Sequence, residues 1–403
     1  MVGKTSRAMA GVVAGAMALS VCASDVDSES APFLELRYRY SNLATDARPM
    51  AGHANTVRLQ FGYLWAFGDR WKAYAEGTQV TSLFGRQYDD GSGRHSRYPV
   101  EADPKASGVT SAWLGYKQDG FELRVGRQYV RLDDGRFFSN NGWRQYPQSF
   151  DGVSVTWRPW QGGELRYDWL GQVNRTVGDD FFDRNQRRWV LNAHLLHFDQ
   201  ALAVGTLTTY GYFVRNDTLA SNSVRTMGVR WKGSTTLGSG ALGWTTELAR
   251  QYNYENNPAR FDLPYHLFEM TYGSKQVAIK AGEERLGGDG TTAFNVAYGA
   301  ARAFNGWVVA FRIPRRGLQE RYVGLFGTTS WARAVDWQVT YRHFMSAQEG
   351  PVLGNELDAG VRIDVGMGFS LEAQYGDYRA SAHEVDERKV WLIAQYRWGK
   401  PVL

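Results

Sequence analysis

The chain of 403 residues has only one cysteine, Cys22, and no long hydrophobic run beyond residue 23. Without a second thiol it forms no internal disulfide and no thiolate metal site. Without a run of about 20 apolar residues it has no membrane-spanning helix. Its net charge is only +5, and no basic run resembles a phosphate-binding patch, so nothing in it indicates a nucleic-acid partner.

The first 23 residues are organised like an export signal. Lys4 and Arg7 precede the apolar run 8–21, and small residues lead up to Ala23. A membrane anchor is the weaker alternative, because the run is shorter than the roughly 20 residues that a span requires. We therefore predict a signal peptide over residues 1–23, cleaved after Ala23, and a single domain over residues 24–403. Without Lys4 and Arg7, 44 basic residues face 41 acidic ones, a net charge of +3.

The chain is rich in aromatic residues, and it contains many segments in which apolar and polar residues alternate. The chain has 15 Trp and 22 Tyr beside 45 Gly, and Tyr and Trp favour membrane interfaces. Apolar and polar side chains alternate over many segments, and a period of two places each set on its own face of a sheet. A chain without apolar helices still spans a bilayer when such segments close into a barrel. The clearest alternation lies at residues 34–40, 56–65, 165–169, 335–342, 357–363 and 369–375.

The connections between these segments alternate in length. Residues 68–70 and 118–120 are tight turns, whereas residues 82–108 and 126–152 are long. A sandwich has no reason to separate long from short connections, but an outer-membrane barrel does. The sequence predicts an all-β, transmembrane antiparallel up-and-down β-barrel of about 18 strands, with long extracellular loops and short periplasmic turns. Both termini should lie at the periplasmic rim. Whether residues 294–311 form an additional hairpin is left undecided by the sequence.

Alternation also predicts which charged side chains surround the lumen. Two interpretations remain open: these charges pair across strands and keep the wall polar, or the arginines form a track for acidic solutes. The predicted basic set is Arg37, Arg39, Arg58, Lys72, Arg124, Arg166, Arg230, Lys280, Arg342, Arg362 and Arg397. The predicted acidic set is Glu35, Glu76, Glu122, Glu164, Asp168, Glu247, Asp336, Asp358 and Glu372.

The long polar connection over residues 126–152 is the strongest candidate for a functional loop. It either folds inward and forms a constriction, or forms a salt-bridged cap that stiffens the rim; Trp143 and Phe150 should be buried. The loop over residues 82–108 is either a lid or a mobile surface loop. Asp133, Asp134 and Asp151 are a weak candidate for calcium. The predicted constriction residues are Arg127, Gln128, Arg131, Asp133, Asp134, Arg136, Arg144 and Asp151.

Nothing in the sequence indicates an enzyme. His194 and His197 are three apart on a predicted strand, so they point to opposite faces and cannot share a metal. His266 and His343 have no serine or acid at hydrolase spacing. We expect no catalytic residues, no metal and no cofactor.

Two blocks of residues carry a resemblance to a known family. The first runs Gly126-Arg127-Gln128, Arg136-Phe137, Gly142-Trp143-Arg144-Gln145 and Phe150-Asp151-Gly152; the second includes Phe294, Phe304-Asn305-Gly306-Trp307, Pro314, Gly317-Leu318 and Tyr322. Together they resemble the alginate-export family of outer-membrane barrels. The resemblance implies a barrel that lets an anionic uronate polysaccharide, or smaller acidic solutes, cross the outer membrane. Its best-known members have a pore-plugging periplasmic loop, and the turn at residues 364–366 is too short for one, which favours the porin-like relatives.

Three functional hypotheses follow. The first is a conduit for acidic saccharide, the second a general or small-carboxylate porin, and the third a barrel enzyme or adhesin. The expected partners are outer-membrane lipid, an anionic saccharide or small acidic solute, and periplasmic export components.

Overall fold

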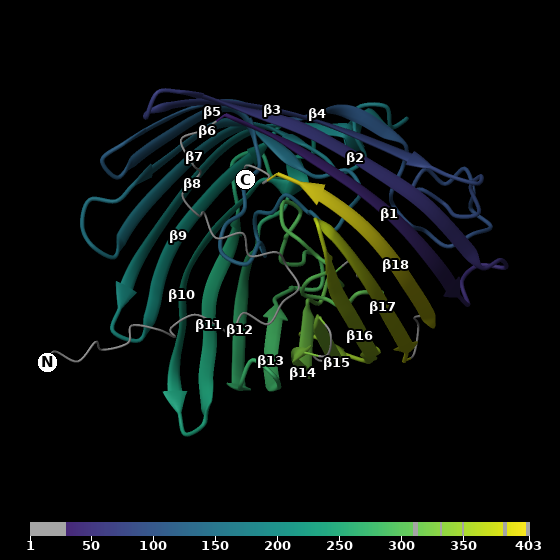
Figure 1. The fold of residues 1–403 in the computed structure, drawn as a ribbon. Coiled ribbons are helices and arrows are strands. Elements are labelled where there is room, and N and C mark those ends of the chain that lie inside the picture. Colours follow the sequence, from purple (N-terminus) through teal and green to yellow (C-terminus); the bar gives the residue numbers. More distant parts are fainter. Residues whose placement is uncertain (1–29, 309–312, 331–332, 349, 382–384, 400–403) are drawn as a thin grey trace, which may run out of the picture.

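The computed structural model describes residues 30–308, 313–330, 333–348, 350–381 and 385–399. The predicted signal peptide lies outside these described residues. The strands pair antiparallel, each with its neighbour in the chain, and β1 also pairs with β18, so the 18-stranded sheet closes on itself (Figure 1). The predicted barrel is confirmed. The strands are β1 (Ala31–Thr45), β2 (Gly52–Phe67), β3 (Trp71–Ser82), β4 (Ala106–Gln118), β5 (Phe121–Gln128), β6 (Ser149–Trp157), β7 (Gly163–Asn174), β8 (Arg188–Leu202), β9 (Gly205–Asn216), β10 (Val224–Leu237), β11 (Gly240–Asn253), β12 (Asp262–Gly273), β13 (Ala278–Leu286), β14 (Leu318–Ser330), β15 (Ala334–Ser346), β16 (Val352–Gly366), β17 (Phe369–Ala380) and β18 (Glu387–Trp398).

Side-chain alternation sorts the two faces of the barrel wall. On β1, Leu36 is 45 % exposed, whereas its neighbour Arg37 is 6 % exposed and Arg39 is fully buried. A basic side chain at the lipid midplane costs about 2–4 kcal/mol. The inward face avoids that cost, because there the same side chain finds hydrogen-bond partners.

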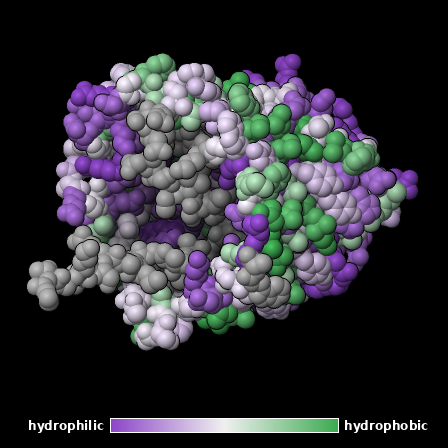
Figure 2. Space-filling view, viewed as in Figure 1, coloured by the Kyte–Doolittle hydropathy of each residue, from purple (hydrophilic) through white to green (hydrophobic). Residues whose placement is uncertain are grey.

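The outer surface is apolar. Figure 2 shows hydrophobic side chains gathered over β1, β17 and β18, and hydrophilic ones inside the opening. Exposed tryptophans, among them Trp65, Trp71 and Trp157, lie near the short turns. Rings with one dry and one wet edge favour this position at a membrane interface.

The helical content is small. The described residues contain one four-residue turn of α-helix, α1 (Arg184–Arg187), and one 3-10 turn, η1 (Ala220–Asn222). No described helix has the length and apolar character needed to cross a membrane.

Connection lengths follow the predicted segregation, with two refinements. The turn between β16 and β17 consists of residues 367–368, and the ends of β1 and β18 lie at this rim of short turns. Some strands extend further than predicted, so the first outer loop is reduced to residues 46–51. The extra hairpin considered at 294–311 is not seen in residues 294–308, the described part of that segment.

Two outer loops fold into the barrel. They are residues 129–148, between β5 and β6, and the described residues 287–308 and 313–317, between β13 and β14; the second of these loops, in green, runs inside the ring of strands (Figure 1). Two glycines in register, Gly126 and Gly152, precede and follow the first of them. A Cβ on Gly152 would lie 2.1 Å from the carbonyl oxygen of Trp169, so no side chain fits where the strands approach.

The inserted loops share an apolar core with one side of the wall. The aromatic rings of Phe137 and Phe138, from the first loop, contact Tyr212 of β9, and Phe294 and Tyr298 of the second loop contact Phe137 and Phe138 respectively. The wall residues of this core come from β6 to β17, and the core has no member on β1 to β5 or β18 among the described residues. The interior is therefore filled asymmetrically.

Candidate functional site

The two inserted loops are joined by backbone contacts. The Ser139 amide donates to the Tyr298 carbonyl (3.1 Å), and the Ala300 amide donates to the Gly135 carbonyl (2.9 Å). A Cβ on Gly299 would lie only 1.9 Å from the carbonyl oxygen of Arg136. This approach is possible only for glycine, and it makes the two loops one unit.

A buried ionic network locks the same junction. Arg136, 1 % exposed, contacts the two carboxylate oxygens of Glu284 on β13 at 2.6 and 2.8 Å. Asn305 donates to Glu284 (3.1 Å) and to Glu320 (3.3 Å), and it accepts from Arg136 (3.1 Å). Glu320 in turn pairs with Arg342. Arg136 and Asn305 belong to the two sequence blocks singled out above, which therefore meet in space.

Strands β1 and β2 hold the first loop through its carbonyls. Arg37 donates to the carbonyls of Arg144 (2.6 Å) and Gly142 (3.1 Å), and its Nε donates to the side chain of Gln145 (2.8 Å). Arg39 donates to the Trp143 carbonyl (3.0 Å). Of the two predicted alternatives, the loop therefore folds inward. Arg37 and Arg39, two of the arginines predicted to face the lumen, hold it in place.

The opposite wall holds the tip of this loop. Asp134 accepts from Arg230 of β10 (2.7 Å), and Asp133 lies 3.2 Å from Nε2 of His197 on β8. Burial alone would raise the pKa of Asp134, but the charge of Arg230 and the hydrogen bond from it hold that pKa below its usual 3.8.

Asp133, His197 and Asp199 bring metal-type ligand atoms within 4.8 Å of one another. However, Asp133 faces Nε2 of His197, and Asp199 faces Nδ1 at 3.6 Å. Nε2 is within hydrogen-bond distance of Asp133, whereas Asp199 is too far from Nδ1 for a hydrogen bond. The two carboxylates thus face different ring nitrogens, and one metal ion binds only one of these. The weak calcium candidate Asp133, Asp134 and Asp151 does not come together, because Asp151 pairs with Arg127 (2.7 Å).

A cavity of about 1280 Å³ runs between these loops and the wall, and it is rich in cations. Seventeen Lys and Arg residues and eleven Asp and Glu residues line it. Of the predicted lumen residues named as the substrate path, seven line the cavity: Arg37, Arg58, Glu76, Arg124, Arg166, Arg342 and Arg362. Arg39, Lys72 and Asp168 lie on the inward face of their strands but do not line it.

Most cations on the wall have acidic neighbours. Glu35 pairs with both Arg58 and Arg397, the latter at 2.6 Å. Arg166 contacts Asp168 at 2.9 Å. On the wall, the interpretation that charges pair within the sheet describes most of what is seen.

The cations contributed by loops differ. Arg144 donates to the Ala102 carbonyl (3.3 Å), Arg131 to the Asp134 carbonyl (2.7 Å), and Arg175 to the Ala297 carbonyl (2.6 Å). Burial lowers the pKa of Arg131 and Arg144, and it lowers the pKa of Arg175 to about 10 and that of Arg302 to about 9. These guanidinium groups have lost water, and their hydrogen bonds to described residues end on neutral oxygens.

The predicted constriction set is divided by the structure. Gln128, Arg131, Asp133, Asp134 and Arg144 line the cavity, whereas Arg136 is buried at the loop junction. Arg127 and Asp151 do not line it. They are cross-strand partners on the outward face shared by Val125 and Val153, because β5 and β6 continue the alternation beyond the predicted strand ends.

The loop over residues 83–105 packs against the first inserted loop instead of standing free. Asp103 accepts from the Gln145 amide (3.0 Å), and Asp89 and Glu101 are buried. Phe150 is fully buried as predicted, and Trp143 is half-buried.

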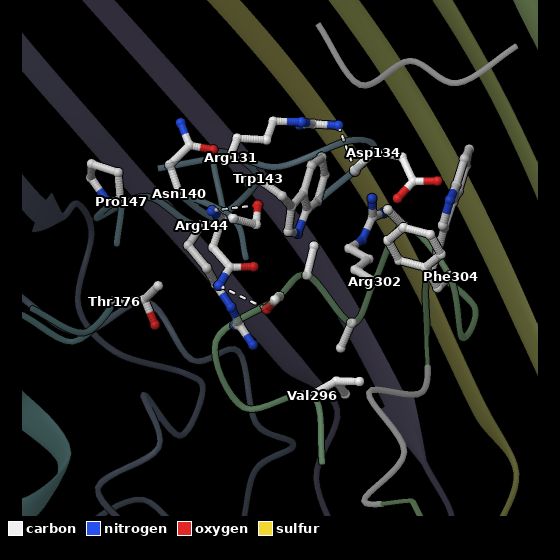
Figure 3. Close-up of a pocket in the computed structure, with 18 of the residues that line it drawn as sticks. Arg131, Asp134, Asn140, Trp143, Arg144, Pro147, Thr176, Val296, Arg302 and Phe304 are labelled. Atoms are coloured by element: carbon white, nitrogen blue, oxygen red, sulfur yellow. Dashed lines mark hydrogen bonds between the residues drawn. The ribbon is translucent and has the colours of Figure 1, made fainter. Parts of the chain in front are cut away.

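Sequence reasoning missed a group from the second inserted loop. Arg302 lines the cavity, and its guanidinium carbon lies 3.5 Å from the ring centre of Trp143 (Figure 3). Arg302 lies two residues before the Phe304-Asn305-Gly306-Trp307 block. That proximity was the only signal available, since nothing local indicates that the loop turns inward.

A family model described as alginate export matches residues 34–395. The chain belongs to the alginate-export family. No curated protein shows a significant match to it. The match to the family model confirms the resemblance predicted from the sequence.

Solved structures of outer-membrane proteins share the fold of this alginate-export family member. OccAB3 from Acinetobacter baumannii is 12 % identical, with 92 % of this chain and 100 % of that chain covered and a TM-score of 0.73. OpdK from Pseudomonas aeruginosa is 14 % identical, with 92 % and 99 % covered and a TM-score of 0.72. The structure of OpdK with vanillate gives 14 % identity, the same coverage and a TM-score of 0.71. Family and fold together make this chain an outer-membrane channel; they are those of transport proteins, not of enzymes.

Proposed function

We propose that this channel passes acidic solutes, and that anionic saccharides such as alginate-like uronate chains or oligomers are its substrates. The observation that supports this proposal is a set of loop arginines that line the cavity and whose hydrogen bonds end on neutral oxygens. In this setting the arginines attract a carboxylate that is not already present in the protein. The set is Arg131, Arg144, Arg175 and Arg302.

The physical argument rests on uncompensated charge. A carbonyl oxygen satisfies a guanidinium N–H but leaves its positive charge in place, so the cavity keeps a positive potential beside the inserted loops. A ring of such charges at a constriction favours anions over cations. Arginine in particular offers a planar fork that fits a carboxylate.

A small-carboxylate porin is the second candidate, and two observations favour it. The inserted loops leave a cavity of about 1280 Å³, a size closer to small ligands than to a polymer. OpdK, which shares the fold, has been solved with vanillate, a small aromatic carboxylate.

Planar bilayers containing the purified channel distinguish these candidates. We expect a reversal potential in a KCl gradient that shows preference for chloride, and a conductance that uronate oligomers reduce. Reduction by benzoate but not by uronate oligomers supports the small-carboxylate porin. A channel that prefers potassium contradicts both.

A further inference from the structure

The guanidinium of Arg302 lies in a cage of three tryptophans. Its central carbon is 3.5 Å from the ring centre of Trp143, 4.4 Å from that of Trp391 and 5.0 Å from that of Trp307. These rings come from the first inserted loop, from β18 and from the second inserted loop. Figure 3 shows the Trp143 indole facing Arg302, with Phe304 on the other side of the guanidinium. Cation–π contacts in such a desolvated site hold the guanidinium in one orientation.

Only part of the hydrogen-bonding capacity of Arg302 is used. Its Nη2 donates to the side-chain oxygen of Gln374 at 2.6 Å. Its Nε is buried and has no hydrogen-bond partner, and Nη1 donates to no described residue. A buried N–H without an acceptor costs about 1–3 kcal/mol.

The three carboxylates that act electrostatically on Arg302 each contact another arginine. Asp358 contacts Arg342 at 2.9 Å, and Glu101 contacts Arg39 at 3.4 Å. Glu372 lies 3.6 Å from Arg362. The positive charge of Arg302 is thus left for a ligand, and its position on the cavity wall makes it reachable from the lumen.

We propose that Arg302, held by Trp143, Trp307 and Trp391, is a carboxylate-binding subsite that recognises one acidic group of the passing solute by geometry. This subsite rests on the proposed function. It differs from a general positive potential, because the two oxygens of a carboxylate can accept together from Nη1 and from the second N–H of Nη2. Chloride is a single sphere, so it cannot place one oxygen on each of two parallel N–H donors as a carboxylate does. The indole walls exclude water, which strengthens the ionic hydrogen bonds.

Glucuronate is the probe, and block of the chloride current in planar bilayers is the measurement. Arg302→Lys keeps the charge and the contact with the indoles but removes the fork; Arg302→Gln removes both. We expect the glucuronate concentration for half-block to rise at least about tenfold in both variants. Arg302→Lys should keep the wild-type preference for chloride over potassium.

Arg158→Gln is the matched control. Arg158 also lines the cavity and the same charge is lost, but the side chain is exposed beside a short turn and already pairs with Glu164 at 2.7 Å. Its half-block concentration should stay within about twofold of wild type. All variants are first checked for the heat-resistant electrophoretic mobility of a closed barrel.

Two results overturn different statements. If Arg302→Lys is blocked like the wild type, charge alone suffices and the subsite is wrong, while the proposed function stands. If glucuronate fails to block the wild-type channel, the proposed function fails and the subsite with it.

Discussion

Replacing Arg136 with methionine removes the cation that joins the two inserted loops. Methionine has a similar length and no charge, so the perturbation is electrostatic more than steric. Glu284 then keeps only the hydrogen bonds from Tyr265 (3.0 Å) and Asn305 (3.1 Å). A carboxylate that is 2 % exposed is left without its counter-ion.

The magnitude follows from the depth of burial. Removing one partner of a buried ion pair costs about 3–5 kcal/mol, because the remaining charge stays desolvated. Only the folded-in arrangement carries this cost, since Glu284 is hydrated again when the loops move outward. The population of released loops should therefore rise by a factor of roughly 150 to 5000.

Limited proteolysis measures the fraction of molecules in which the loops are released. Trypsin reaches Arg131 and Arg144 only when the first loop leaves the barrel, so cleavage rates in liposomes follow the open fraction. Mass spectrometry of the fragments identifies cuts after these two residues.

The double variant Arg136→Met with Glu284→Leu is the control. Replacing both partners of a buried pair by apolar groups is often close to neutral, so its cleavage should return to within about tenfold of wild type. Cleavage of the single variant at the wild-type rate, or of the double variant as fast as the single, refutes the reasoning.

Three further changes test the geometry. Gly299→Val should separate the loops, since the Arg136 carbonyl occupies the space of the new side chain, and raise single-channel conductance; unchanged conductance contradicts the packing described. Gly152→Val should lower the yield of refolded barrel, measured by electrophoretic mobility, and a wild-type yield would count against the close strand approach. The pKa of Asp134 lies below 3.8, so its stabilising contact with Arg230 is complete above that pH and is lost only below it. Conductance of a His197→Asn variant, which lacks the imidazole beside Asp133, should therefore stay constant from pH 8 to about pH 5. A change within that range would show that another group controls the loop.

Strand alternation was readable because it is local. Leu36 and Arg37 differ in environment only through a period of two, which the chain displays directly. The same rule explains one difference from prediction: the sequence predicts Arg127 and Asp151 in the constriction loop, whereas β5 and β6 extend through them, and the alternation turns them outward.

The inward course of the loops was not readable in the same way. Arg136 and Glu284 are 148 positions apart in the chain, and their contact depends on the barrel having closed around both. No periodic pattern in the sequence of residues 129–148 or 287–317 indicates that these loops fold into the barrel. The tryptophan cage of Arg302 is still harder to predict from the sequence, because its three rings come from three separate parts of the chain.

The one-sided apolar interior bears on how the barrel is put together in the membrane. Its members span β6 to β17 and both inserted loops, whereas the seam between β1 and β18 is joined inside by polar contacts such as Gln395 with Glu35 (3.1 Å). Polar contacts exchange readily with water, whereas a packed aromatic interior does not. The seam therefore lies outside the apolar core, and parting β1 from β18 would expose polar side chains, not the packed aromatic rings.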